Sequence, residues 1–125
     1  MLKAENISKS FIDRSSGKSF RLLQDVSLEI APGEAVALMG GSGSGKSTLA
    51  RLLLRLLPCD AGKIYFRGTE ITELSGKELA GFRHAVQFIS QRPESFLDPR
   101  KNLGYSLREA LEVFSLPYVE EQALA

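Results

Sequence analysis

Gly40-Gly41-Ser42-Gly43-Ser44-Gly45-Lys46-Ser47, followed by Thr48, is the stretch that decides the fold of this chain. It matches in full the eight-residue pattern of a phosphate-binding loop. The apolar run 35–39 before it predicts a strand buried on both faces of a parallel sheet. Leucines at helical spacing after it predict a helix over residues 46–58. Strand, loop and helix in this order are the setting that the motif requires.

The residues of this stretch suit the binding of Mg-ATP. Its glycines allow backbone conformations in which successive N–H groups point at phosphate oxygens, and the helix start adds its positive dipole end. Lys46 supplies a full charge for the β- and γ-phosphates, and the Ser47 hydroxyl is a hard oxygen ligand for Mg²⁺. A flexible Gly/Ser linker would lack the apolar flanks. We therefore expect ATP to bind at Gly40, Gly41, Ser42, Gly43, Ser44, Gly45, Lys46, Ser47 and Thr48.

The remaining periodicity predicts further strands and helices. Apolar alternation predicts half-buried strands at 2–11 and 26–30, joined by a polar loop, with shorter strands at 64–66 and 86–90. Two sequences with capping-box spacing, beginning at Ser75 and Ser106, predict the starts of short helices. The second helix has one apolar face, made by Leu107, Ala110, Leu111 and Phe114.

Composition excludes several functional classes. Sixteen basic and fifteen acidic residues leave a net charge of +1, so we expect no nucleic-acid partner and no binding to an anionic membrane surface through charge. The single cysteine, Cys59, has no partner for an internal disulfide. No apolar run is long enough for a membrane span or a signal peptide, so a role at a membrane would require docking through a partner.

Two segments that flank the loop carry a family resemblance. The sequence Leu23-Gln24-Asp25-Val26-Ser27-Leu28-Glu29-Ile30-Ala31-Pro32-Gly33-Glu34 and the sequence Asp60-Ala61-Gly62-Lys63-Ile64 resemble those of ATP-binding-cassette (ABC) ATPases. The resemblance implies an α/β fold: a phosphate-loop (P-loop) NTPase core of mixed or parallel sheet with flanking helices, preceded by an antiparallel β subdomain. The expected parts are the β hairpin at 1–34, the core at 35–100 and the start of the helical subdomain at 101–125.

The resemblance also implies roles for residues outside the loop. Phe11, which by itself would be taken as a core or hairpin aromatic, is at the place of the residue that stacks on adenine. Gln91, by itself an ordinary loop glutamine, resembles the residue that contacts Mg²⁺ and senses the γ-phosphate. The segment 95–100 is similar to that of nickel and peptide importers, with Asp98 where those have Asn. His84 does not match the switch histidine and is expected to be structural or on the surface.

Two catalytic features of the family do not occur in these 125 residues: the Leu-Ser-Gly-Gly-Gln signature, and an apolar strand ending in Asp-Glu. Ser75-Gly76-Lys77-Glu78 precedes the glutamine loop and lacks the second glycine, so it is not the signature. We therefore expect a front part of the domain, truncated before the signature motif and the Walker B strand. It should bind nucleotide, and without the general base it should not hydrolyse it alone.

The hypothesis for function is the ATP-binding subunit of an importer of nickel or peptides. The resemblance implies transmembrane permease subunits and a second ATP-binding subunit as partners, and a periplasmic or extracellular solute-binding protein as an indirect partner. The expected location is peripheral, at the cytoplasmic face of the cell membrane. Two alternatives stay open: a truncated module that only binds nucleotide, and a soluble P-loop kinase or motor ATPase.

Overall fold

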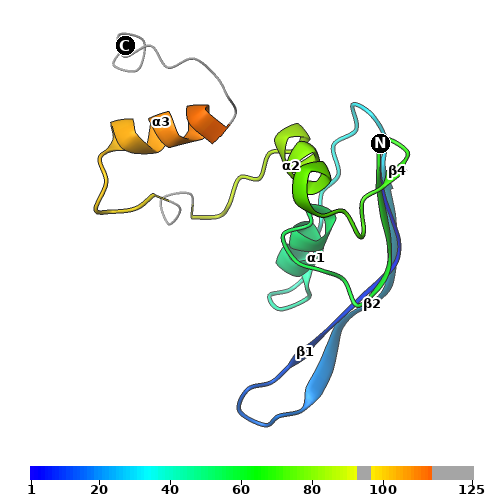
Figure 1. Ribbon diagram of the computed structural model, residues 1–125. Coiled ribbons are helices and arrows are strands. Elements are labelled where there is room, and N and C mark those ends of the chain that lie inside the picture. The colour runs from blue at the N-terminus through cyan, green and yellow to red at the C-terminus, as the bar shows by residue number, and fades with distance from the viewer. Residues whose placement is uncertain (93–96, 114–125) are drawn as a thin grey trace. The chain divides into compact units, whose positions relative to one another are not determined.

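The chain forms two compact units, Met1–Val86 and Gln87–Ala125, each described by itself. A computed structural model describes residues 1–92 and 97–113 (Figure 1). The predicted three-part division at residues 34 and 100 stays a prediction.

The first unit is built on a four-stranded sheet of order β2-β1-β3-β4 in which every neighbouring pair is antiparallel. The expected strands at 2–11, 26–30 and 64–66 are confirmed, and each is longer than its sequence pattern indicated. Their bounds are Leu2–Ile12 for β1, Ser19–Ile30 for β2, Ala61–Phe66 for β3 and Thr69–Glu70 for β4.

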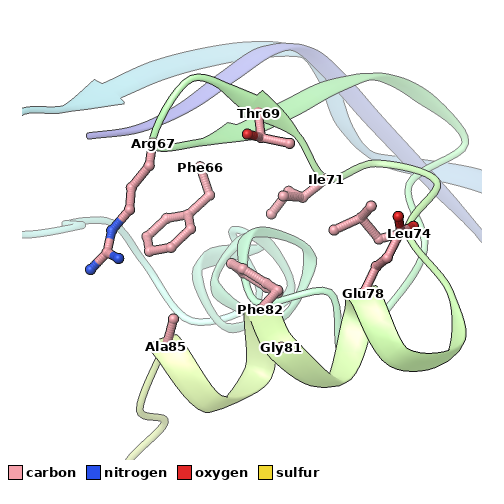
Figure 2. A pocket seen from close by; sticks show the side chains of 9 residues that line it. All are labelled: Phe66, Arg67, Thr69, Ile71, Leu74, Glu78, Gly81, Phe82 and Ala85. Carbon is pink, nitrogen blue, oxygen red and sulfur yellow. The ribbon is translucent and has the colours of Figure 1, made fainter.

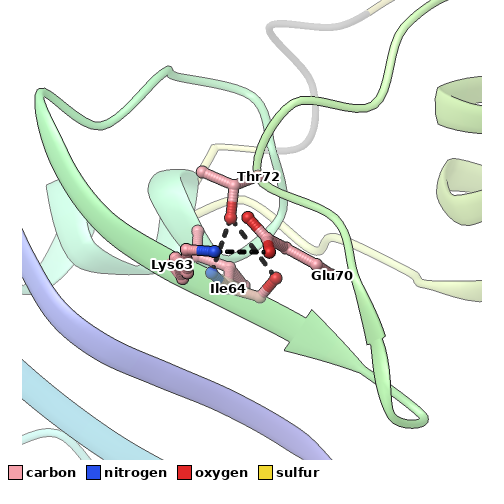
Figure 3. A network of polar contacts seen from close by, with 4 residues as sticks. All are labelled: Lys63, Ile64, Glu70 and Thr72. Carbon is pink, nitrogen blue, oxygen red and sulfur yellow. Dashed lines mark hydrogen bonds and ion pairs between the residues drawn. The ribbon is translucent and has the colours of Figure 1, made fainter.

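The β3–β4 hairpin turns through two residues with positive φ, Arg67 at 51° and Gly68 at 85°. Positive φ at both central positions is the type I′ geometry that matches the twist of paired strands. Beside the turn, the buried Thr72 hydroxyl accepts a 2.8 Å hydrogen bond from the Ile64 N–H, and Lys63 pairs with Glu70 at 2.9 Å (Figure 3). These two side-chain contacts therefore join β3 to β4 and to the residues after it, in addition to the short backbone ladder between β3 and β4.

Close backbone approach fixes the crossing of β1 and β3. A Cβ on Gly62 would lie 2.5 Å from the carbonyl oxygens of both Glu5 and Asn6, and Gly62 has φ +93°. The pairing register shifts next to this point, between Glu5 and Ser8. Only glycine combines this conformation with this space, so the glycine of the Asp60–Ile64 segment has a structural reason.

Two helices cover one face of the sheet in this unit, α1 at Lys46–Leu53 and α2 at Gly76–Ala85 (Figure 1). Their buried apolar side chains meet those of the strands in a single core. The buried members are Ala4, Ile7, Leu23, Leu49, Leu52, Leu53, Ile64, Ile71 and Phe82. Burial of this apolar area is the main force that holds α1 against the sheet. His84 lies on the exposed surface of α2, as expected.

The helix after the loop ends earlier than the leucine pattern predicted. The expected end at residue 58 is wrong, because the chain leaves the helix at Leu54. Arg55 adopts φ +53°, its N–H donates to the Leu52 carbonyl, and the Leu56 N–H donates to the Arg51 carbonyl. These two bonds are the Schellman pattern, which satisfies the last carbonyls of a helix. Arg55 occupies the left-handed position where glycine is usual, so the sequence contains no glycine there that would have predicted the end of the helix.

The two strands expected at 35–39 and 86–90 are not formed in the described residues. A strand buried on both faces needs a paired neighbour on each side, and no described segment pairs with either run. Apolar side chains in these runs are consequently exposed: Val36, Leu38, Met39, Phe88 and Ile89. The described sheet therefore contains antiparallel pairs and none of the parallel pairs that we expected.

The second unit contains one described helix, α3 at Leu103–Val113. It begins three residues before the predicted capping box, because the Asn102 side chain accepts a 2.8 Å hydrogen bond from the Tyr105 N–H. The helix start predicted at Ser75 is confirmed, since Ser75 is the N-cap of α2, although its side chain makes no cap bond. None of the described residues of α3 is buried, and Phe114 lies outside the described residues. Within the described residues, no helix has the length and apolarity needed to cross a membrane.

An ion pair ties the loop after α1 to the sheet. The Lys9 ammonium lies 2.5 Å from Asp60 Oδ1, and the Ser10 N–H donates to Asp60 Oδ2 at 2.7 Å. The hydrogen bond from Lys9 is the largest cause that lowers the pKa of Asp60, followed by the Ser10 N–H. Asp60 is therefore charged at neutral pH and bound through both oxygens.

We predict that Leu52→Ala lowers the free energy of unfolding by about 2–5 kcal/mol, because Leu52 is fully buried between α1 and the sheet. Leu56→Ala is the matched control, since that leucine is 48% exposed, and it should cost less than about 1 kcal/mol. Urea unfolding followed by circular dichroism measures both. Equal losses in the two variants would contradict the assigned core.

We predict that acid weakens the wild-type fold more than it weakens Asp60→Asn. The lowered pKa of Asp60 means that its stabilising contribution is complete above the unfolded pKa, near about 4, and is lost as pH falls through the folded value. The amide cannot titrate. Asp13, whose pKa Ser15 lowers to about 2, contributes equally to both proteins. Urea unfolding at about pH 6 and about pH 3 measures the difference, and equal acid losses would refute it.

Candidate functional site

The predicted phosphate loop lies against the middle of the β1–β2 hairpin. Gly45 is buried, has φ +90°, and immediately precedes α1. A Cβ at this position would lie 2.8 Å from Leu23 Cδ2 and 3.4 Å from Leu22 Cγ. Glycine is thus required at residue 45 by its conformation, and a Cβ there would in addition displace the end of the Leu23 side chain. This contact fixes where the helix starts relative to the sheet.

The Lys46 side chain folds back over the loop that precedes it. Its ammonium donates to the carbonyl oxygens of Gly40 at 2.8 Å and Gly41 at 2.7 Å, and to Ser44 Oγ at 3.3 Å. A Cβ on Gly40 would lie 2.9 Å from Ser44 Oγ, so the loop is tightly wrapped. The structure therefore brings the loop and its lysine together, with the charge held at the centre of the loop.

The start of α1 offers further donors. Its first intrahelical bond runs from the Leu49 N–H to the Gly45 carbonyl at 2.8 Å. The N–H groups of Lys46, Ser47 and Thr48 precede that bond and so have no intrahelical acceptor. Ser47 is exposed, and no acidic residue occupies the first turn to compete for the dipole. An anion at this end of the helix would meet N–H donors and one ammonium group.

Phe11 lies on the same sheet face as the loop. Ile7 enters the core under α1, Lys9 reaches Asp60 in the loop after α1, and the Phe11 ring centroid lies 5.8 Å from the Lys9 ammonium, so these three side chains lie on one side of β1. The Phe11 ring is half-buried beside Phe20, with centroids 6.2 Å apart. Lys9 pairs with Leu23 in the β1–β2 ladder, and Gly45 contacts Leu23. Phe11 is thus two residues along β1 from the point where the loop meets the sheet.

Gln91 belongs to the second unit and is exposed. Its expected contacts with Mg²⁺ and with the γ-phosphate therefore stay predictions. Among the described residues, no group of three or more His, Cys, Asp or Glu side chains could hold a metal ion. A magnesium ion at Ser47 would need its remaining oxygen ligands from phosphates, water and groups such as Gln91, which suits the few protein ligands that Mg²⁺ usually takes beside nucleotides.

Sequence reasoning did not single out Lys9 and Asp60 as neighbours of the site. The available signal was weak: Lys9 is a charged residue on the strand face that also carries Ile7 and Phe11. Its side chain is only 12% exposed, because Asp60 approaches it from the loop after α1.

A hollow lies between the β3–β4 hairpin and α2, and the residues that line it all follow the phosphate loop in the sequence (Figure 2). Its volume is about 350 Å³, and its floor is apolar, formed by Phe66, Ile71, Leu74 and Phe82. The Phe66 and Phe82 rings meet edge to face with centroids 5.3 Å apart. The picture shows Arg67 and Glu78 toward opposite ends of this hollow. It contains no residue that the phosphate-loop motif predicts.

Comparisons with known proteins identify the family of this chain. The sequence matches the ABC transporter family over residues 23–123. It is 39% identical over 113 residues to a Brucella ovis protein named as a candidate peptide import ATP-binding protein, covering 90% of this chain and 35% of that protein. It is 40% identical over 121 residues to the glutathione import ATP-binding protein of Escherichia coli K12, covering 93% of this chain and 19% of that protein.

A solved structure gives the same answer for the fold. The dimeric post-hydrolysis state of an ATP-binding cassette, bound to ADP and phosphate, superimposes with a TM-score of 0.59 at 32% identity, covering 66% of this chain and 35% of that one. The chain thus spans about a third or less of the length of these relatives. From the loop with its central lysine, the hairpin beneath it and a match across most of its residues, the chain belongs to the ABC transporter family of ATP-binding cassettes.

Proposed function

We propose that this chain is the Mg-ATP-binding part of the ATP-binding subunit of an ABC importer of the peptide type. The observation that carries the proposal is the wrapped loop, in which the Lys46 ammonium sits among the Gly40 and Gly41 carbonyls. A cation held there, at the start of a helix, is placed to meet an anion. The family membership supports a nucleotide as that anion.

Binding of triphosphate requires the loop contacts to exchange. The carbonyl oxygens of Gly40 and Gly41 satisfy Lys46 in this structure, and phosphate oxygens would replace them as acceptors. Charge-assisted bonds to phosphate are stronger than those to neutral carbonyls, so the exchange is favourable. The Ser47 hydroxyl would then bind Mg²⁺ beside the β- and γ-phosphates. The Cβ-free positions at Gly40 and Gly43, with φ +150° and +80°, give the loop the freedom to reorient its amides.

Phe11 is proposed as the stacking surface for adenine. Its half-buried ring, beside Phe20 and on the face that carries the loop, supports that role. Gln91 is proposed as the γ-phosphate sensor, a role that rests on the family resemblance of the segment 86–92.

The proposal extends to the whole protein of which such a chain would form part. There, two ATP-binding subunits and transmembrane permease subunits would couple ATP hydrolysis to import at the cytoplasmic face of the membrane. A solute-binding protein would deliver the cargo. The relatives' names specify peptide and glutathione import, which favours a peptide-type cargo over nickel. Family membership leaves the kinase alternative without support, whereas the binding-only alternative depends on the turnover experiment below.

We predict that Lys46→Ala weakens Mg-ATP binding by about tenfold to a hundredfold, because a charged hydrogen bond contributes about 1.5–3 kcal/mol. Isothermal titration calorimetry on residues 1–125 measures the affinity. Lys63→Ala is the control, because it removes a lysine ammonium on β3, outside the loop, that pairs with Glu70. Equal affinities of wild type and Lys46→Ala would remove the assignment of the loop.

We further predict that residues 1–125 alone bind Mg-ATP without turnover above the Lys46→Ala background. The sequence contains neither the Asp-Glu strand end nor the signature that position water and γ-phosphate in the family. Phosphate release from purified protein measures it. Turnover that is present in wild type and lost in Lys46→Ala would show that these residues hold a catalytic base of their own.

A further inference from the structure

Asp60, in the loop that follows α1, holds three consecutive residues of β1. Its two carboxylate oxygens accept from Lys9 Nζ at 2.5 Å and from the Ser10 N–H at 2.7 Å. Its own N–H donates to the Ser8 carbonyl at 3.0 Å. One residue therefore fixes both the backbone and a side chain of the strand segment that leads directly to Phe11.

This ion pair differs from the usual surface pair. Exposed pairs contribute little, because water and salt screen them and long side chains lose entropy. Here the Lys9 side chain is only 12% exposed, so it is largely withdrawn from water, although Asp60 is 44% exposed. Replacement of Asp60 by Asn would remove the charge that pairs with the sheltered ammonium and leave one oxygen to accept from either Lys9 or the Ser10 N–H. The segment would then lose its fixed position.

The tied segment lies between the two parts of the proposed nucleotide site. On one side, Lys9 pairs with Leu23, the residue that Gly45 of the phosphate loop contacts. On the other side, Phe11 follows two residues later on the same strand face, with its ring centroid 5.8 Å from the Lys9 ammonium. Lys9 thus lies between the strand position that the loop contacts and the Phe11 ring.

We propose that Asp60 is a positioning residue for the base of the nucleotide: it anchors β1 through Lys9 and Ser10 so that Phe11 keeps a fixed separation from the phosphate loop. The proposal rests on the proposed function, because it assumes that ATP spans the loop and Phe11. Asp60 contacts neither of them, and it acts by ordering the stacking surface in advance, which reduces the entropy lost on binding. The triphosphate, which needs only the loop, should not depend on Asp60.

Two ligands separate these contributions in wild-type and variant forms of residues 1–125: Mg-ATP, and inorganic tripolyphosphate with Mg²⁺, which has no base. In Asp60→Asn we expect the affinity for ATP to fall about fivefold to tenfold, within the range that base stacking on an aromatic side chain contributes. Affinity for tripolyphosphate should stay within about twofold of wild type. Glu70→Gln is the matched control, because it removes the Lys63–Glu70 ion pair of the same sheet, and it should change neither affinity.

Lys9→Met provides a second variant in case Asp60→Asn does not fold, as judged by circular dichroism. It removes the ammonium and leaves the bond from the Ser10 N–H to Asp60, and it should lower the ATP affinity selectively too. Unchanged ATP affinity in the folded variants, or equal loss of both ligands, would overturn the positioning role. A wild-type chain that binds neither ligand would instead refute the proposed function and the inference with it.

Discussion

The close approach of Gly45 to Leu22 and Leu23 is the contact on which the rest of the first unit depends. The φ of +90° at Gly45 is strained for any residue with a side chain, and a Cβ there would lie 2.8 Å from Leu23 Cδ2, so that the Leu23 side chain would have to shift. This contact places the first turn of α1 on the hairpin. From that start, the helix period directs Leu49, Leu52 and Leu53 into the core, and the phosphate loop remains on the surface above β1 and β2.

Packing of the α1 leucines in the core also fixes the other end of α1 relative to the sheet. The helix ends in a Schellman motif at Arg55, and the chain returns to the sheet through Asp60. Gly62 follows, passing against the backbone of Glu5 and Asn6. The segment from Gly45 to Gly62 is therefore attached to β1 and β2 at its beginning, middle and end. Such repeated attachment explains how the β1–β2 hairpin can hold the loop 40–48 and the Phe11 ring on one face.

The loop 40–48 is packed against the hairpin at Gly45 and is held inside by hydrogen bonds from Lys46. The Lys46 ammonium donates to two carbonyl oxygens that would otherwise be open to water. These two hydrogen bonds hold its charge at the centre of the loop. Residues 36–39, which precede the loop, lack such contacts. Their apolar side chains are exposed, because no strand among the described residues pairs with this run. The loop is thus well ordered by its contacts where the antiparallel strands and α1 meet, and the apolar run before it is unpaired where a parallel neighbour would be needed.

The sequence by itself determined the phosphate loop, the helix start after it, three of the strands and the family. These features depend on local rules: glycine spacing, a lysine and serine at fixed offsets, and alternation of period two or 3.6. Tertiary structure decided the rest. Residues 35–39 look like a buried strand, but a strand exists only with its partners. Arg55 ends a helix that leucine periodicity would extend, because its backbone bonds complete a cap. Lys9 and Asp60 meet across 51 residues, and only the folding of α1 against β1 could bring that pair beside Phe11.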